Sequence, residues 1–371
     1  MKPHIIFILL DGSRVDKIET SSEFVELLNE GTLVNNVTTS MPYTFGALNT
    51  ILTGQYGKEN GVNGYYKVAN LRSDIPFLPE ILEQNEYFTA RGLMDNRILS
   101  TRGFHITEEF NEYDEDLNIK HPELIKSSFS KANGKPLFVL LQFSRIHTVT
   151  ATKVLNKFEW DDQSFYDNKK ENMKNYELVF REAGIYSKKI LDVINELGIL
   201  ENSIIIFFSD HGTGIGERFG ERNYGSFTYE ETIRTYYHFI GKDILKNNSS
   251  SSLISSIDIL PTILDLSGIT ISAKLPGKSF SKFLKGEKTY LEEKDFTFSE
   301  TGALHGPFPS PEKSNVFCIK TSTHKLIFQK DQNEWSLFDL KSDPNELNNL
   351  FGKGLSVENL LKKQLLTWIK R

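Results

Sequence analysis

The chain has 371 residues, of which 39% are hydrophobic and 25% are charged, the usage of an ordinary globular protein. The formal net charge is −6, so no basic excess argues for a nucleic-acid partner. This length fits one large α/β domain with an appendage, or two domains.

The single cysteine, Cys318, excludes an internal disulfide framework and fits a reducing compartment. The apolar run at residues 5–10 is too short for the apolar region of a signal peptide, and it ends in Asp11. No run approaches the roughly 18 apolar residues that span a bilayer. We therefore expect a cytoplasmic protein without a membrane span. The sequence leaves its oligomeric state open.

Apolar runs alternate with helical patterns over most of the chain. HIIFILL (4–10) has no polar alternation, which is typical of a strand buried on both faces. A helix is predicted over 22–29 and another near 77–84. A short strand follows at 87–93, and a second buried strand is predicted over 136–144. The polar segment 153–175 has few aliphatic residues and is interpreted as a long surface loop or lid.

The same alternation continues with a helix over 176–197, a third buried strand over 202–210 and a helix over 256–266. From residue 296 the pattern changes to short strands at 296–300, 315–322, 324–330 and 334–340, followed by a final helix. We therefore predict an α/β fold with a mostly parallel central sheet, helices on both faces and a small C-terminal antiparallel sheet. The expected domains are a catalytic domain over 1–290 and an α+β subdomain over 291–371.

The stretch TTSMPYTFGALNTILTGQYG (38–57) places the hydroxyl of Thr44 on a turn before a helix-like run. Ser and Thr are favoured as helix N-caps, because their side-chain oxygen accepts an orphan backbone N–H. The alternative is a nucleophile held where the helix N-terminus favours negative charge. The stretch alone favours the cap.

Acidic residues end two of the apolar strands. The first strand runs into Asp11, and the strand at 202–210 runs into Asp210 and His211. In open α/β sheets, ligands bind outside the carboxyl ends of the strands. Carboxylate oxygens with one imidazole suit a divalent metal, whereas the alternative is that the aspartates cap turns. The adjacent pair favours a metal, because burying two such groups without a role is costly.

Several motifs occur together in a specific order. They are LLDGSRVD (9–16), PYTFGALNTILTGQYGKENGV (42–62), FTARGLMDN (88–96), QFSRIHT (142–148), SIIIFFSDHG (203–212), YEETIR (229–234), IDILPTILDLSGI (257–269) and the C-terminal HKLIF with WSLFDLKSDPNELNNL (324–350). In this order and spacing, the chain resembles the sulfatase-like branch of the alkaline phosphatase superfamily over nearly its whole length. The resemblance implies an alkaline-phosphatase-like fold.

The resemblance also assigns candidate roles. In this family the nucleophile lies nine residues before the Thr of a (L/V)TG tripeptide, and counting back from Thr53 gives Thr44. The family's ligands correspond to Asp11, Thr44, Asp210 and His211, which implies one divalent ion of Mn, Zn, Mg or Ca. Coordination would lower the pKa of the Thr44 hydroxyl and make it a nucleophile.

Further site residues follow from the same motifs. His147 takes the place of a family histidine that contacts the transferred group or protonates the leaving oxygen. Its alternative is a histidine in a surface loop. Asn96 corresponds to a residue that donates to a substrate oxygen. Arg14 and Asp16 match the DxxRxD pattern, and we expect them to pair as scaffold.

The chain departs from the sulfatase signature C/S-x-P-x-R, whose Cys or Ser is converted to formylglycine. It has Thr44, with Gly46 and Leu48 at the proline and arginine positions, and threonine cannot form that aldehyde. Ser40-Met41-Pro42 resembles the signature but lies four residues out of register.

Threonine is the residue used by phosphodiesterase, phosphonate hydrolase and phosphoglycerol transferase relatives. We therefore expect a metal-dependent hydrolase or transferase that acts on a small-molecule or glycan-type phosphate or phosphonate ester through a covalent Thr44 intermediate. One alternative is a sulfatase that works without formylglycine, and another is an inactive family member that acts as a binding protein. No D-x-x-x-H motif for a second metal is present. His305 is the one late histidine that suggests a further ligand, but the pattern favours a loop residue there, so we expect a single-metal site.

Overall fold

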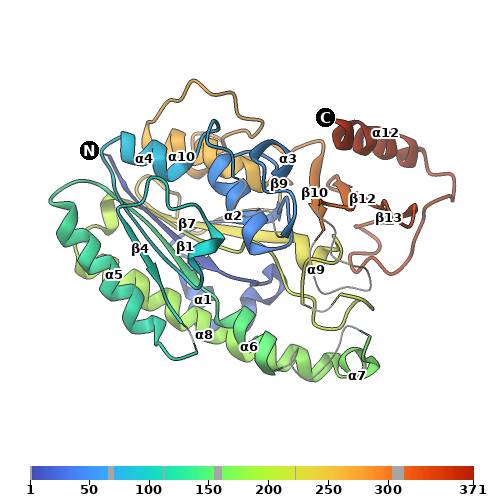
Figure 1. The fold of residues 1–371 in the computed structure, drawn as a ribbon, viewed down its shortest axis with the longest axis horizontal. Coiled ribbons are helices and arrows are strands. Elements are labelled where there is room, and N and C mark those ends of the chain that lie inside the picture. Colours follow the sequence, from blue (N-terminus) through green and yellow to red (C-terminus); the bar gives the residue numbers. More distant parts are fainter. Residues whose placement is uncertain (1, 66–70, 112, 154–160, 222, 303–312) are drawn as a thin grey trace.

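The computed structural model describes residues 2–65, 71–111, 113–153, 161–221, 223–302 and 313–371, with the backbone alone for 151–153. Within these residues, nine strands form a mixed sheet in the order β4–β3–β5–β1–β6–β7–β2–β8, and β9 pairs with β2 (Figure 1). The strands are β1 (His4–Leu10), β2 (Gly31–Thr38), β3 (Phe88–Leu93), β4 (Ile106–Glu109), β5 (Leu137–Phe143), β6 (Ser203–Phe208), β7 (Arg234–Gly241), β8 (Asn248–Ser250) and β9 (Ile254–Ser255).

The central strand β1 runs parallel to both of its neighbours, β5 and β6. Leu9 is in register with Gln142 of β5 on one side and with Phe208 of β6 on the other. The pairs β5–β3 and β3–β4 are also parallel, whereas β7 is antiparallel to β6 and β2. The predicted mostly parallel sheet is therefore confirmed, and the carboxyl ends of β1, β5 and β6 meet at one edge.

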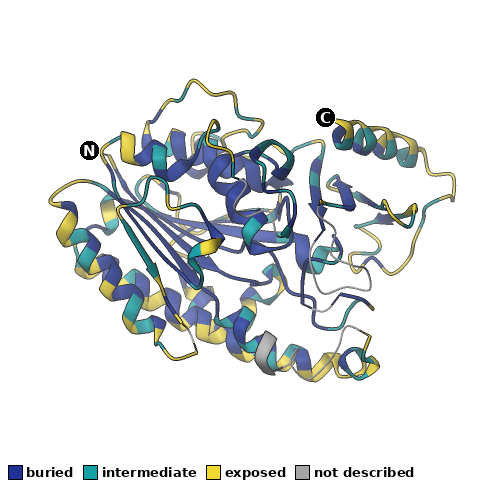
Figure 2. Ribbon diagram, in the orientation of Figure 1, coloured by how far each residue is buried: buried dark blue, intermediate teal, exposed yellow. Residues whose placement is uncertain are grey.

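Alternate residues of β1 face two separate hydrophobic cores. Ile5, Phe7 and Leu9 pack into one core, and Ile6, Ile8 and Leu10 pack into the other. This explains why the strand has no polar alternation, since both of its faces are buried under helices (Figure 2).

Helices cover both faces of the sheet. The first core contains residues of α2 (Thr44–Thr53), α4 (Leu78–Gln84), α10 (Ile259–Ser267) and α11 (Ser281–Leu284), with α3 (Gly57–Asn60) after α2. The second contains residues of α1 (Ser22–Leu28), α5 (Leu117–Ala132), α6 (Arg145–Lys153) and α8 (Lys169–Glu196), with α7 (Gln163–Asp167) before α8. Short 3₁₀ helices are η1 (Val15–Thr20), η3 (Asn96–Ile98), η5 (Leu200–Asn202) and η6 (Ser256–Asp258).

A second sheet of four antiparallel strands forms in the C-terminal part of the described chain. Its strands are β10 (Thr297–Thr301), β11 (Val316–Lys320), β12 (His324–Gln329) and β13 (Glu334–Asp339), and α12 (Ser356–Lys370) packs on it. Buried Lys325 lies 2.6 Å from Glu346 and 3.1 Å from Glu230 of α9 (Glu230–Ile233), which ties this sheet to the central one. The predicted small antiparallel sheet is confirmed. The domain boundary at residue 290 stays a prediction.

Some elements differ from the sequence-based expectations. The polar segment 153–175 is not a continuous loop, because α7 and the first turns of α8 lie within it; residues 154–160 are not among those described. Lys and Glu are good helix formers and are exposed at residues 169–171 and 174, while Phe165 is fully buried. Strands β2 and β7 and helix α5 were not predicted, because Asn and His interrupt their apolar patterns.

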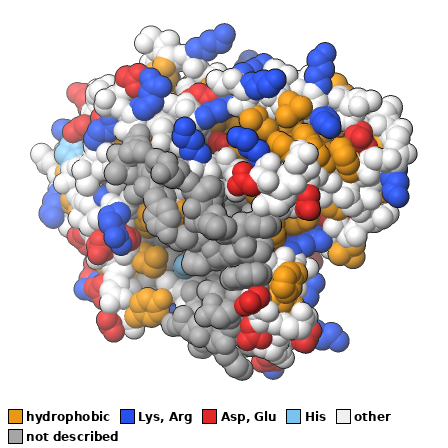
Figure 3. All heavy atoms as spheres, turned by 45° about the vertical axis from the view of Figure 1, so that its right-hand side comes forward, with side chains coloured by type: hydrophobic (Ala, Val, Ile, Leu, Met, Phe, Trp, Pro, Cys, Tyr) orange, Lys and Arg blue, Asp and Glu red, His pale blue; other side chains and the backbone are white. Residues whose placement is uncertain are grey.

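The surface is mixed in charge. Figure 3 shows Lys and Arg interspersed with Asp and Glu on the face it presents, around residues that are not described. None of the described helices combines the length and the apolar character that crossing a bilayer requires.

Candidate active site

Three of the expected ligands meet at the carboxyl ends of neighbouring strands. Asp11 directly follows β1, and Asp210 and His211 follow β6 after one intervening residue. Thr44 reaches the same point as the first residue of α2. The N-cap interpretation of Thr44 is wrong, because Tyr43 holds that position and Thr44 instead directs its hydroxyl toward Asp11.

The four side chains are buried and close together. Thr44 Oγ1 lies 3.4 Å from both carboxylate oxygens of Asp11 and 3.3 Å from His211 Nε2. His211 Nε2 is 3.5 Å from Asp11 Oδ1 and 3.5 Å from Asp210 Oδ2. The ligand atoms of Asp11, Asp210 and His211 all lie within 4.8 Å of one another. The sequence-predicted set therefore forms one cluster.

The tautomer of His211 follows from its surroundings. Its Nδ1 lies 2.8 Å from the carbonyl oxygen of Gly212, which can only accept, so Nδ1 donates to that oxygen and Nε2 is directed at the cluster. Asp210 Oδ2 is buried there and has no hydrogen-bond partner in the described part of the chain. Several acceptors thus face one point with too few protons between them, and a divalent cation fits this donor set.

His147 adjoins this cluster through Tyr224. The ring of Tyr224 lies 4.4 Å from that of His211 and 5.1 Å from that of His147, measured between centroids. Burial raises the pKa of Tyr224 well above its ordinary value, and the nearby Tyr65 and Asp11 raise it further by smaller amounts, so its hydroxyl stays protonated. Tyr224 was not predicted, because it lies in a loop that carries no recognisable motif.

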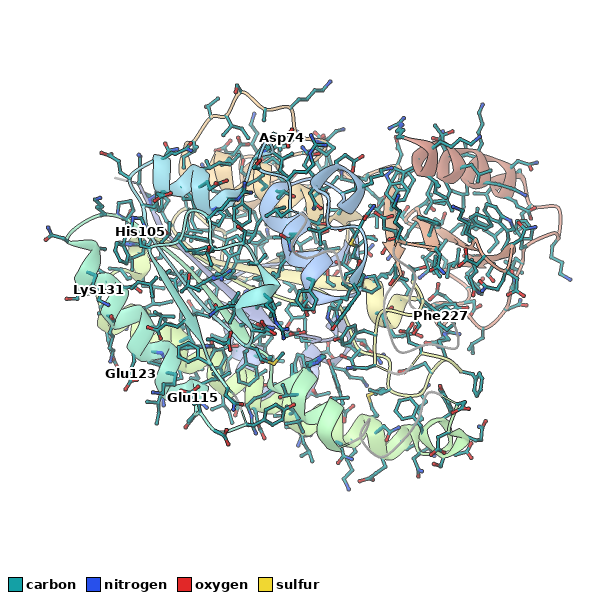
Figure 4. The ribbon with its side chains drawn as sticks, in the orientation of Figure 1. Asp74, His105, Glu115, Glu123, Lys131 and Phe227 are labelled. Carbon is teal, nitrogen blue, oxygen red and sulfur yellow. The ribbon has the colours of Figure 1, made fainter. Side chains whose placement is uncertain are left out.

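The loop that carries Tyr224 is held from both sides. The buried Glu221 carboxyl accepts hydrogen bonds from the backbone N–H groups of Ser226 (2.9 Å) and Phe227 (2.8 Å). Thr301 of β10 donates its hydroxyl to the carbonyl of Gly225. Phe227 is labelled in Figure 4, where it lies on the side of the central sheet that faces the C-terminal subdomain.

Gln142, the last polar residue of β5, was also missed. Its Nε2 donates to Asp11 Oδ2 at 2.7 Å, so it contacts the proposed cation site directly from the neighbouring strand. The available signal was a buried-strand pattern, LFVLLQF, broken by one amide near its carboxyl end.

The remaining candidates make contacts with other residues. Asn96 begins η3, and its Oδ1 lies 3.4 Å from an Arg91 guanidinium nitrogen, so in this structure its amide contacts Arg91. The expected Arg14–Asp16 pair is present at 2.9 Å, and Glu217 joins it at 2.7 Å. His305 lies outside the described residues.

Comparison with known proteins gives named relatives. An N-acetylglucosamine-6-O-sulfatase of Bacteroides thetaiotaomicron is 34% identical over 173 residues, which cover 44% of this chain and 29% of that protein. The chain thus spans less than a third of this relative's length. The solved structure of a protein in complex with its substrate, D-glucosamine-2-N,6-O-disulfate, superimposes on this chain with a TM-score of 0.76 at 19% identity. The match covers 100% of this chain and 98% of that protein chain. A phosphonate monoester hydrolase of Agrobacterium radiobacter superimposes with a TM-score of 0.77 at 15% identity, covering 99% and 95%.

The sulfatase among these relatives contradicts the expected phosphate- or phosphonate-ester activity. The N-acetylglucosamine-6-O-sulfatase is 34% identical, whereas the phosphonate hydrolase shares the fold alone at 15% identity. The expectation rested on Thr44 as the nucleophile type. That inference was too strong, because a hydroxyl can attack a sulfuryl group as well as a phosphoryl group, and the metal acts on the oxygens of either.

Two family models match the chain. The model described as sulfatase matches residues 3–269, and that described as N-sulphoglucosamine sulphohydrolase, C-terminal, matches residues 220–371. The first includes the whole Asp11, Thr44, Asp210 and His211 cluster, and the second includes the C-terminal sheet. The resemblance of the motifs is thereby confirmed: the chain belongs to the sulfatase family.

Proposed function

We propose that this protein hydrolyses sulfate esters of a sulfated sugar, with Thr44 as its nucleophile and without formylglycine. Family membership and the sugar sulfatase among the relatives support the reaction class. The observation that carries the proposal is the position of Thr44 Oγ1, which lies 3.3–3.4 Å from Asp11 and His211 at the N-terminus of α2. The helix N-terminus favours the negative charge of a sulfate at this point.

Asp11, Thr44, Asp210 and His211 would hold one divalent cation. When bound, the cation would neutralise charge on the sulfate oxygens and favour the ionised form of the Thr44 hydroxyl. Oxygen ligands with one imidazole are compatible with Mn, Mg, Ca or Zn. The identity of the ion stays a prediction for metal analysis.

In the first step, Thr44 Oγ1 attacks sulfur, and the bond between sulfur and the sugar oxygen breaks. Thr44 loses its proton to water, while protonated His147 gives its proton to the leaving sugar oxygen. In the second step, neutral His147 accepts a proton from water as the water oxygen attacks sulfur. Thr44 leaves and regains a proton from water, and hydrogen sulfate is released.

The proposal is tested by trapping the sulfated enzyme. Metal-loaded protein is mixed with an aryl sulfate and quenched within one turnover, and the peptide containing residues 38–57 is examined by mass spectrometry. We expect one sulfo group on Thr44, and Thr44→Ala should lose both the adduct and turnover.

Ser40→Ala is the matched control. Ser40 lies on the same turn, and its buried hydroxyl has no hydrogen-bond partner among the described residues, so its removal should leave turnover within about twofold. Equal loss in the two variants, or sulfation of another residue, would show that the nucleophile is misassigned.

A further inference from the structure

Gln142 occupies a position that joins two parts of the site. Its side chain is 2% exposed at the carboxyl end of β5, in register with Leu9, two residues before Asp11. Its Nε2 donates to Asp11 Oδ2 at 2.7 Å, and its Oε1 accepts from the backbone N–H of Met94 at 3.1 Å. The amide therefore bridges a ligand of the proposed cation and the segment that follows β3.

The orientation of this amide is fixed by its partners. A backbone N–H can only donate, so the oxygen of the amide must face Met94 and the nitrogen must face Asp11. Glutamine is suited to this bridge, because it donates at one end and accepts at the other. An ionised glutamate would accept at both ends and repel Asp11, and methionine would reach the same place with neither bond.

The bridge constrains the Asp11 carboxylate. Gln142 binds Oδ2, and the backbone N–H of Asp11 donates to the carbonyl of Phe143 at 3.0 Å, so β5 holds both the main chain and the side chain of this ligand. A charge-assisted bond of this length fixes the rotation of a carboxylate better than a neutral bond does.

The other end of the bridge is equally constrained. The guanidinium of Arg91 is fully buried and donates to the backbone carbonyls of Leu99 (2.7 Å), Ser100 (3.1 Å) and Asn96 (3.2 Å). These bonds fold residues 94–100 into a fixed turn, and Gln142 attaches the start of that turn to Asp11.

We propose that Gln142 is a positioning residue, which orients Asp11 for the cation and links cation binding to the turn at residues 94–100. The inference rests on the proposed function's single cation site. Partners that orient a ligand in this way typically change metal affinity or activity by about 10–100-fold when they are removed.

The test measures Mn²⁺ affinity of the full chain by isothermal titration calorimetry. Gln142→Met keeps the length and burial of the side chain, and we expect its Kd to rise by about 10–100-fold. Thr89→Val is the control, because Thr89 is also buried in the sheet and donates to the carbonyl of Gly103 at 2.6 Å. Its neighbour His105 is labelled in Figure 4, at the end of the sheet away from the C-terminal subdomain. The control should lose stability but keep its Kd within about twofold.

Hydrogen exchange with and without Mn²⁺ provides a second measurement. Bound Mn²⁺ should slow exchange of the Met94 amide several-fold, because it immobilises Asp11 and through it Gln142. Gln142→Met should exchange this amide faster with and without the ion. An unchanged Kd in Gln142→Met, or the same rise in Thr89→Val, would overturn the inference.

The outcomes also separate this inference from the proposed function. If wild-type protein binds Mn²⁺ but hydrolyses no sulfate ester, the proposed reaction fails and the Kd comparison still decides the role of Gln142. If wild-type protein binds no divalent ion, the cation site and this inference are both wrong.

Discussion

Asp210→Asn should make the metal-free protein more stable while it abolishes activity. Asp210 Oδ1 accepts from the backbone N–H groups of His211 (2.9 Å) and Gly12 (3.3 Å), and an amide oxygen can keep both bonds. Its Oδ2 is buried without a hydrogen-bond partner among the described residues, facing Asp11. The amide nitrogen of Asn would face the same point as a donor and would remove a like charge.

The magnitude follows from the spacing of the two carboxylates. Their ligand atoms lie within 4.8 Å of each other. Two like charges at about 5 Å repel by about 3 kcal/mol at an effective dielectric constant of about 20. Relaxation reduces the gain, so we expect the free energy of unfolding without metal to rise by about 1–3 kcal/mol. With Mn²⁺ at about 1,000 times its Kd, the wild-type protein instead gains about 4.1 kcal/mol, and the variant gains almost nothing.

Urea unfolding of both proteins, with a chelator and then with Mn²⁺, measures these differences. The expected pattern is a crossover, with the variant more stable in chelator and the wild-type protein more stable in metal. A variant that is less stable than wild type in chelator would show that the site is not a cluster of repelling charges. Equal stabilisation of both proteins by Mn²⁺ would show that Asp210 is not a ligand.

Three further predictions concern His147, His238 and Glu221. His147→Gln should slow hydrolysis of an alkyl sulfate by about 10²–10⁴-fold but that of a nitrophenyl sulfate much less, because a good leaving group needs no proton; equal losses would remove its role as acid. Burial lowers the pKa of His238 from 6.5 to about 3, so its neutral form supports the fold above pH 6.5. As the pH falls from 6.5 toward 3, the free energy of unfolding of the wild-type protein should drop by about 1.4 kcal/mol per pH unit relative to that of His238→Leu, measured in urea titrations. Parallel dependences of the two free energies on pH would contradict this. Burial raises the pKa of Glu221 from 4.5 to about 8, so the stability contributed by its protonated form is complete below pH 4.5 and is lost as the pH rises through 8. Relative to wild type, Glu221→Gln should therefore become steadily more stable between pH 5 and 8, and a constant difference between the two proteins would refute the shift.

The sequence was informative where a local pattern has one physical explanation. An all-apolar strand that ends in Asp11, and another that ends in Asp210 and His211, required burial on both faces and a shared carboxyl edge, and the structure has both. Thr44 was placed by its register to the LTG tripeptide. Its contact with Asp11 could not be derived from the stretch alone, which favoured an N-cap.

Other features depend on contacts between distant segments. Gln142 meets Asp11 and Met94 only because β5 lies between β1 and β3, and Tyr224 meets two histidines through a loop held by Glu221. No local pattern encodes such contacts. The choice between sulfate and phosphate esters failed for a related reason, since the type of the nucleophile does not specify the group it attacks.

The central claim is that this site hydrolyses sulfate esters. Its most direct test compares the sulfate ester and a phosphodiester of the same nitrophenol, on metal-loaded wild-type protein with Thr44→Ala as the blank. We predict multiple turnovers of the sulfate ester at a higher kcat/KM than the phosphodiester, all dependent on Thr44. Release of no more than one equivalent of nitrophenol from the sulfate ester, or faster turnover of the phosphodiester, would contradict the account.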